Sequence, residues 1–291
     1  VLVPITTGLT DDRPEHIAFH HNILFVSRDA SITHCGPGEP YRWGAADLGG
    51  EIAAGDVVTC MISMTGNQTA PALAVFQEDN TSILYGADPD PTTGDFNFVN
   101  FSTDSGARAY SAQAMFDIFV FDHLGVTALT PTLNFGNFTP NTFTRNLMPF
   151  ILQERERVIA SCPNHTKSQY RVYFSDGYGL YLTFNGQQFI GAMPVLFIHP
   201  VTCDDCYTTV AGEEVFYFGS SDGFVYQLEK GTSFDGSAID AYITLAWDNF
   251  RAPRQIKAYK GARVEVSTSA YVTFNFGYQL GYGTTTITQP A

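Results

Sequence analysis

The sequence predicts an all-β protein: a β-propeller built of blades of roughly 48 residues, followed by a small antiparallel β-sandwich domain. Three observations support this fold class. A two-stranded motif recurs five times, apolar and polar residues alternate over short segments, and the composition favours strands. The chain has 24 Phe, 15 Tyr and 26 Gly in 291 residues, and only 15% of its residues are charged. Many short strands joined by glycine turns give such a composition.

The repeated motif is clearest in Val215–Leu228, which reads as a β-hairpin. Phe216 and Phe218 lie on one face of its first strand, Gly219–Gly223 forms the turn, and a second apolar strand follows. A single hairpin cannot bury its apolar face alone, and neighbours repeating every 40–50 residues fit propeller blades. The alternative is an all-β sandwich with similar hairpins. The first strands of the five copies end at Phe25, Phe76, Phe121, Phe174 and Phe218.

The chain is predicted to have three parts: an N-terminal arm at 1–15, the propeller at 16–235 and the sandwich domain at 236–291. The first blade begins at His16–Val26 and closes at Tyr41–Trp43. Later hairpins follow the repeat, and the segments Phe189–Met193 and Pro200–Cys203 are assigned to the fifth blade. The last part is predicted to contain the strands Ala238–Trp247, Arg254–Tyr259, Ala262–Thr268, Ala270–Tyr278 and Gly283–Ile287.

One helical insertion interrupts the strand pattern near 141–157. Leu147, Phe150 and Ile151 fall at helical spacing, and Pro149 is compatible with a helix only near its start. Thr142 or Thr144 can cap this short helix at its N-terminus. We therefore expect a helix here, inserted beside the propeller.

The net charge of −14 and the isoelectric point near 4.7 argue against a surface that grips nucleic acid phosphates. They are compatible with a channel wall past which a polyanion slides without sticking. No apolar run approaches the roughly 20 residues of a transmembrane helix, so we expect no membrane insertion. The chain begins at Val1 without a signal peptide, which suggests a piece of a longer polypeptide. An odd number of cysteines, five, suggests synthesis in a reducing compartment.

The sequence predicts no catalytic, cofactor-binding or metal-binding residues. Cys203 and Cys206 form a CxxC pair, but no second pair completes a zinc site, and the two intervening acids disfavour a reactive thiol. Asp176 and Asp222 lie in Ser-Asp-Gly turns that loosely resemble sialidase aspartate boxes. They lack the closing Trp and are interpreted as turn residues. Five Asn-x-Ser/Thr triplets, at Asn67, Asn80, Asn100, Asn137 and Asn164, are interpreted as chance matches.

Three segments together resemble the β-propeller structural proteins of bacteriophage tails, of the nozzle or packaged-DNA-stabilising type. They are the runs Gln169–Gly186, His199–Cys203 and Phe216–Gly236. The resemblance covers about 16–240 as a pattern and not as a catalytic signature. It implies a non-enzymatic virion protein that assembles in the host bacterial cytoplasm into a ring of identical subunits around the DNA channel.

The same resemblance implies the partners: other copies of the chain, other tail or neck and portal-side proteins, tail fibres, and passing genomic DNA bound without sequence specificity. Abundant aromatic residues suit large permanent interfaces between subunits. The alternative function is a carbohydrate-binding or glycosidase-type propeller that contacts host surface glycans, which requires carboxylates and Trp or Tyr at the central mouth. A generic protein-binding propeller is the third possibility.

Overall fold

The structure is a computed structural model, and its described residues fall into two units, 1–236 and 237–291. All assigned helices and strands lie in the first unit, and the described residues of the second carry none. The predicted sandwich strands are therefore not formed among those residues, and most of the N-terminal arm lies outside the described part. The described residues are 13–64, 72–131, 138–142, 144, 147–245, 248, 250–251, 254–255, 260–261, 263–267 and 272–277.

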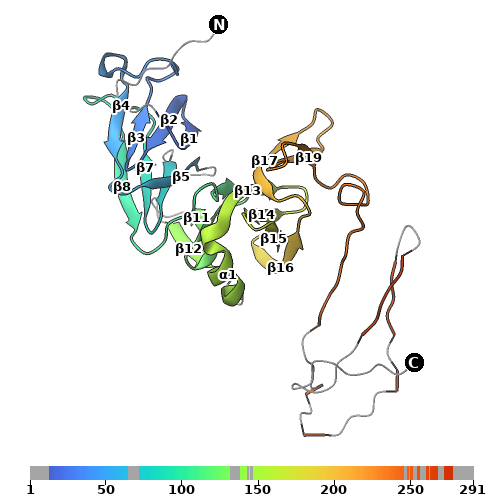
Figure 1. Cartoon of the computed structure of the whole chain (residues 1–291). Coiled ribbons are helices and arrows are strands. Elements are labelled where there is room, and N and C mark those ends of the chain that lie inside the picture. Colours follow the sequence, from blue (N-terminus) through green and yellow to red (C-terminus); the bar gives the residue numbers. More distant parts are fainter. Residues whose placement is uncertain are drawn as a thin grey trace. The chain divides into compact units, whose positions relative to one another are not determined.

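The first unit consists of five antiparallel sheets, none of them closed, and in each sheet the strands follow one another in chain order (Figure 1). The first sheet contains β1 (Ile17–His20), β2 (Ile23–Arg28), β3 (Ser31–His34) and β4 (Gly50–Ala53). The second contains β5 (Val58–Ser63), β6 (Ala72–Gln77), β7 (Thr81–Tyr85) and β8 (Asn97–Ser102). The third contains β9 (Gln113–Ala114), β10 (Ile118–Asp122), β11 (Gly125–Pro131) and β12 (Phe138–Thr142).

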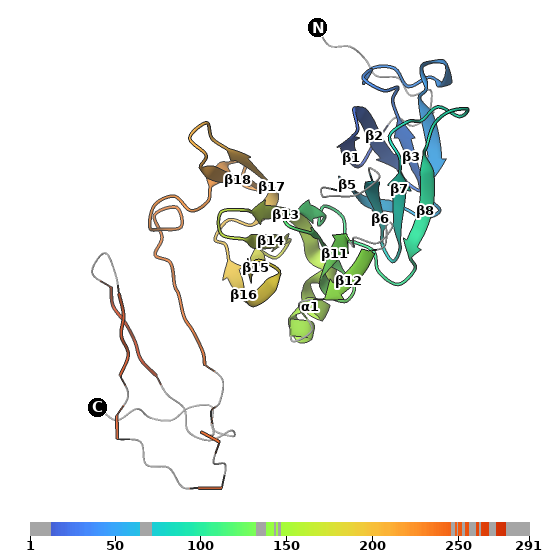
Figure 2. The ribbon, with the colours of Figure 1, turned by 180° about the vertical axis from the view of Figure 1, so that it is seen from behind.

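The remaining two sheets follow the same order along the chain (Figure 2). The fourth contains β13 (Val158–Asn164), β14 (Gln169–Phe174), β15 (Tyr178–Asn185) and β16 (Gln188–Leu196). The fifth contains only three strands, β17 (Val201–Thr208), β18 (Glu214–Ser220) and β19 (Val225–Gln227). The all-β class is thus confirmed, as is the repetition of a sheet five times.

All five predicted hairpins are present as the second and third strands of the sheets. In the fifth sheet, β18 pairs with β19 with Phe218 opposite Tyr226, and Gly223 takes a positive φ of 87° in the turn between them. Glycine adopts this conformation without the steric penalty of a Cβ atom. The equivalent hairpins are β2–β3, β6–β7, β10–β11 and β14–β15.

Two predicted sheet assignments are wrong. The segment Phe189–Met193 belongs to β16, which pairs along β15 and completes the fourth sheet rather than beginning the fifth. The first sheet is closed by β4 and not by Tyr41–Trp43, which lies in the connection before it. In both cases the local pattern indicated an extended segment, but only the pairing partner decided which sheet received it.

The predicted helix is present but shorter, with α1 spanning Met148–Glu154 and a 3-10 turn at Arg155–Arg157. Pro149 lies in its first turn, as expected. Neither predicted cap is used, because Leu147 occupies the N-cap position without a side-chain hydrogen bond. The buried Thr144 instead accepts a hydrogen bond from the Val126 N–H at 2.9 Å, which ties this connection to β11.

Four apolar clusters join the sheets face to face in chain order. Phe25 and Leu73 belong to the cluster between the first and second sheets, and Phe76 and Val120 to the cluster between the second and third. Tyr173 and Phe218 belong to the cluster between the fourth and fifth sheets. Between the third and fourth sheets the rings of Phe121 and Phe174 meet edge to face, 5.9 Å apart. The leading strands of neighbouring sheets also contact one another, as in β1 with β5 and β13 with both β9 and β17.

Candidate functional site

The leading strands of all five sheets border one cavity of about 530 Å³. The lining residues come from the first strand of each sheet, or from the residues just before it. These strands are β1, β5, β9, β13 and β17. All five sheets therefore line this one cavity, which is the natural candidate for a functional site. Its wall consists of Glu15, His16, Ile17, Cys60, Met61, Tyr110, Ala112, Gln113, Ile159, Ala160, Ser161, Thr202, Cys203 and Asp204.

Hydrogen bonds between sheets hold part of this wall. The Ser161 hydroxyl donates to the Tyr110 carbonyl oxygen at 2.7 Å, and the Gln113 side-chain amide donates to the Ser161 carbonyl oxygen at 2.7 Å. The rings of His16 and Tyr110 contact each other with their centroids 5.0 Å apart. These polar groups mostly satisfy one another, so this side of the wall is a rigid support rather than a set of free ligands.

The wall is acidic among the residues that the structure describes. It contains the carboxyl groups of Glu15 and Asp204 and no Lys or Arg. Burial raises the pKa of Asp204 to about 7, against the opposing effect of the neighbouring Cys162 thiol. One carboxyl oxygen of Asp204, Oδ2, is buried and has no hydrogen-bond partner among the described residues. Asp204 is thus a partly buried acid that is easily protonated near neutral pH.

The CxxC cysteines do not form a pair. Cys203 and Cys206 are three residues apart on one strand, so their side chains point to opposite faces of β17. Cys203 is exposed and borders the cavity, whereas Cys206 packs in the cluster between the fourth and fifth sheets beside Cys162. Burial raises the pKa of both Cys162 and Cys206.

This arrangement predicts a graded thiol reactivity in the native protein. An aromatic disulfide reagent is expected to modify Cys203 rapidly, Cys206 slowly, and Cys35, Cys60 and Cys162 only after unfolding, because the last three thiols are buried and the reagent cannot reach them. The measurement is the time course of released thiolate, with Cys203→Ser as the control that removes the fast phase. Modification of Cys162 as fast as Cys203 would contradict the structure.

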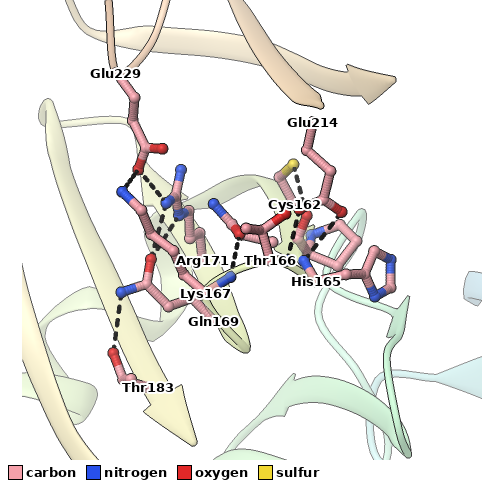
Figure 3. Close-up of polar contacts among 11 residues, drawn as sticks. Cys162, His165, Thr166, Lys167, Gln169, Arg171, Thr183, Glu214 and Glu229 are labelled. Carbon is pink, nitrogen blue, oxygen red and sulfur yellow. Dashed lines mark hydrogen bonds and ion pairs between the residues drawn. The ribbon is translucent and has the colours of Figure 1, made fainter. Parts of the chain in front are cut away.

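The fourth and fifth sheets are joined by a buried arginine (Figure 3). Arg171 has no exposed surface and lies between the rings of Tyr181 and Phe216, 4.5 and 4.8 Å from their centroids. Its guanidinium donates to the Gln169 amide oxygen at 2.8 Å and pairs with the Glu229 carboxylate. These contacts link β14 and β15 of the fourth sheet to β18 and to Glu229, which follows β19. They therefore fix the position of the fifth sheet against the fourth.

A second contact in Figure 3 joins the same two sheets. The Glu214 carboxylate accepts hydrogen bonds from the backbone N–H groups of His165 and Thr166, at 3.1 and 2.7 Å. These bonds lower the pKa of Glu214 although partial burial opposes them. The acid therefore holds the β13–β14 turn against the start of β18, outside the cavity wall.

The two aspartates of the Ser-Asp-Gly turns serve as turn residues, as predicted. Asp176 accepts a hydrogen bond from the Tyr178 N–H at 3.1 Å, and Asp222 accepts one from the Phe224 N–H at 3.0 Å. Neither residue lines the cavity. Sequence reasoning did not single out Asp204 or Arg171, because each lacks a motif; the only signal for Arg171 was a charge within an otherwise apolar strand.

No group of three His, Cys, Asp or Glu side chains in the described ranges is arranged to hold a metal ion. None of the helices in those ranges has the length and apolar character needed to cross a bilayer.

Comparison with known proteins gives similarity of structure alone. No protein-family model and no curated protein sequence matches the chain. Solved structures that resemble it include Raptor from Chaetomium thermophilum, with 11% identity, a TM-score of 0.47 and coverage of 76% of this chain and 20% of Raptor. Another is BBS1N, crystallised in complex with ARL6DN, with 11% identity, a TM-score of 0.42 and coverage of 73% and 59%.

A third similar structure is the extracellular domain of the hybrid two-component system BT4673 from B. thetaiotaomicron. It has 6% identity and a TM-score of 0.46, and the alignment covers 74% of this chain and 26% of that one. This chain therefore spans less than two thirds of the length of all three proteins.

Proposed function

We propose that the five sheets are blades of a β-propeller and that the chain is a non-catalytic structural protein of a tailed bacteriophage. In this proposal it is a tail component, of the nozzle, neck or hub, and copies of it form a ring around the DNA channel. The observation that carries the proposal is the set of five apolar-packed sheets whose leading strands all line one cavity. A repeated array of sheets packed face to face can act as a mechanical scaffold, because its apolar contacts join each sheet to the next.

The electrostatics support a wall that does not retain DNA. Residues 1–236 carry 26 acidic and ten basic side chains, so any channel that copies of this unit enclose has acidic surroundings. Binding to the phosphate backbone depends on Lys and Arg that displace condensed counterions. A surface on which acidic side chains outnumber basic ones holds a polyanion weakly and allows it to pass.

The test measures mass and DNA affinity on the same preparation. Light scattering is expected to give a multiple of the 31.9 kDa chain mass, electron microscopy to show rings, and duplex DNA to remain unbound even at low salt. A monomer at every concentration would contradict the ring. Salt-dependent DNA binding would contradict the passive channel wall.

A carbohydrate-binding or glycosidase-type propeller is the second candidate. The observation that favours it is the presence of Glu15, Asp204 and Tyr110 in the wall of one cavity, since carboxylates and an aromatic ring are the groups that such a site requires. It predicts binding or cleavage of host surface glycans that is lost on Tyr110→Ala or Glu15→Gln. Glycan arrays and reducing-sugar assays with these variants separate the two candidates.

A further inference from the structure

The two end sheets of the array each keep one face that no described sheet covers. The four apolar clusters join consecutive sheets, and none joins the fifth sheet to the first. On the first sheet Ile17 and Phe19 are 67% and 65% exposed, and on the fifth Tyr207 and Val225 are 53% and 73% exposed. The ends of a stacked array normally need polar capping faces, so exposed apolar residues there indicate a missing partner.

The uncovered face of the fifth sheet is defined by its strand register. Tyr207 lies opposite Val215, and Val225 lies opposite Gly219, two residues beyond Tyr217 on the same side of β18. The rings of Tyr207 and Tyr217 stack in parallel with their centroids 6.2 Å apart. We call Tyr207, Val215, Tyr217 and Val225 the fifth-sheet face. The opposite face of the sheet, with Phe216 and Phe218, packs on the fourth sheet.

The second unit has apolar side chains that lack a cover in the chain as described. Within 263–267, Val264 and Val266 alternate with polar residues, and within 272–277, Val272, Phe274 and Phe276 do the same. Each of these five side chains is about half exposed. Such alternation is the pattern of strands that bury one face, so these segments need an apolar surface to pack on.

The charges of the two units are opposite. Residues 1–236 have a formal charge of −16, from 26 acidic and ten basic side chains, whereas residues 237–291 have a formal charge of +2, from three acidic and five basic side chains. In a homo-oligomer the second unit of one copy can therefore approach the first unit of another with electrostatic attraction. Contacts between two different surfaces of identical chains are heterologous, and they generate rings when the rotation closes.

We propose that residues 263–267 and 272–277 of one copy pack as added strands on the fifth-sheet face of a neighbouring copy. This inference rests on the proposed ring and identifies the surfaces through which neighbouring copies contact each other in it. Phe274 and its apolar neighbours cover Tyr217 and Val225 across the interface, and the basic second unit faces the acidic array. The partner recognised by this face is thus a second copy of the chain.

The test uses photo-cross-linking between isotopically distinct copies of the full chain. A benzophenone amino acid is placed at Val225 in unlabelled protein, which is mixed with ¹⁵N-labelled wild-type chain before irradiation. Mass spectrometry is expected to find mixed-isotope cross-links to 263–277, whereas the same photo-group at Tyr41, an exposed aromatic residue of the first sheet connection, gives none. Cross-links confined to single chains, or to other residues, would overturn the proposal.

A matched pair of substitutions tests the same contact by mass. Phe274→Asp is expected to raise the concentration for half-dissociation at least about tenfold, a loss of about 1.4 kcal/mol per contact. Thr273→Asp adds the same charge one residue earlier, on the other side of the segment, and leaves assembly unchanged. Equal weakening by both substitutions counts against the contact. If the wild-type chain forms rings but the cross-links map to other residues, this contact is wrong and the proposed ring stands. If the wild-type chain is a monomer, the proposed ring is wrong as well.

Discussion

Replacing Glu229 by Gln is expected to destabilise the first unit by about 3 kcal/mol. The Arg171 guanidinium is fully buried, and Glu229 is the anion that pairs with it. Without that carboxylate the cation stays buried between two aromatic rings and has lost its charged partner. Urea denaturation followed by far-UV circular dichroism measures the change in the free energy of unfolding.

Two further variants separate this effect from the loss of a surface charge pair. Lys167 also binds Glu229, at 2.8 Å, but its side chain is about half exposed, so Lys167→Met is expected to cost less than about 1 kcal/mol. Adding Arg171→Met to Glu229→Gln removes the uncompensated cation and is expected to restore part of the stability. A cost for Lys167→Met equal to that of Glu229→Gln would show that burial of Arg171 is not the cause.

The substitution Asp204→Asn is expected to stabilise the protein at pH 8 by about 2 kcal/mol and to have little effect at pH 4. Burial raises the pKa of Asp204 to about 7, above its ordinary value of 3.8, so the folded state holds a proton there that the unfolded state has lost. The wild-type free energy of unfolding therefore falls as the pH rises from about 4 to about 7 and is level above that range. The neutral amide of Asn has no such titration.

The adjacent Asp205 supplies the matched control for this prediction. It occupies the opposite face of β17 and is exposed, and its charge is only a secondary contribution to the raised pKa of Asp204, so Asp205→Asn is expected to change the pH dependence of stability much less than Asp204→Asn. The measurement is the urea midpoint at intervals from pH 4 to pH 8 for the three proteins. An Asp204→Asn curve parallel to the wild-type curve would mean that Asp204 is charged and solvated in the folded protein.

The hairpins were predictable because each is a local feature. In Val215–Leu228 the alternating aromatic residues and the Gly-rich turn specify two paired strands without any information from elsewhere in the chain. The presence of the short helix at Met148–Glu154 was predictable for a similar reason, from its spacing and from Pro149. Its cap was not, because Thr144 is bound to the distant Val126 N–H.

The assignment of strands to sheets was less predictable. Phe189–Met193 reads equally well as the last strand of one sheet or the first of the next, and the register along β15 decided it. The site residues depended on the fold to a greater degree. Asp204 and Cys206 both belong to the Cys203–Cys206 motif, and the sheet packing brings both of them to Cys162, a contact that the motif does not indicate.

By itself the sequence determined that this chain is all-β, that it repeats a hairpin five times, and that it is acidic, since these properties reside in neighbouring residues and in composition. Only the tertiary structure decided that the leading strands line one cavity, that Arg171 is buried between two sheets, and that the end faces are left uncovered. Each of these depends on contacts between residues far apart in the chain, and the energy of such contacts comes from burial, which no local pattern specifies.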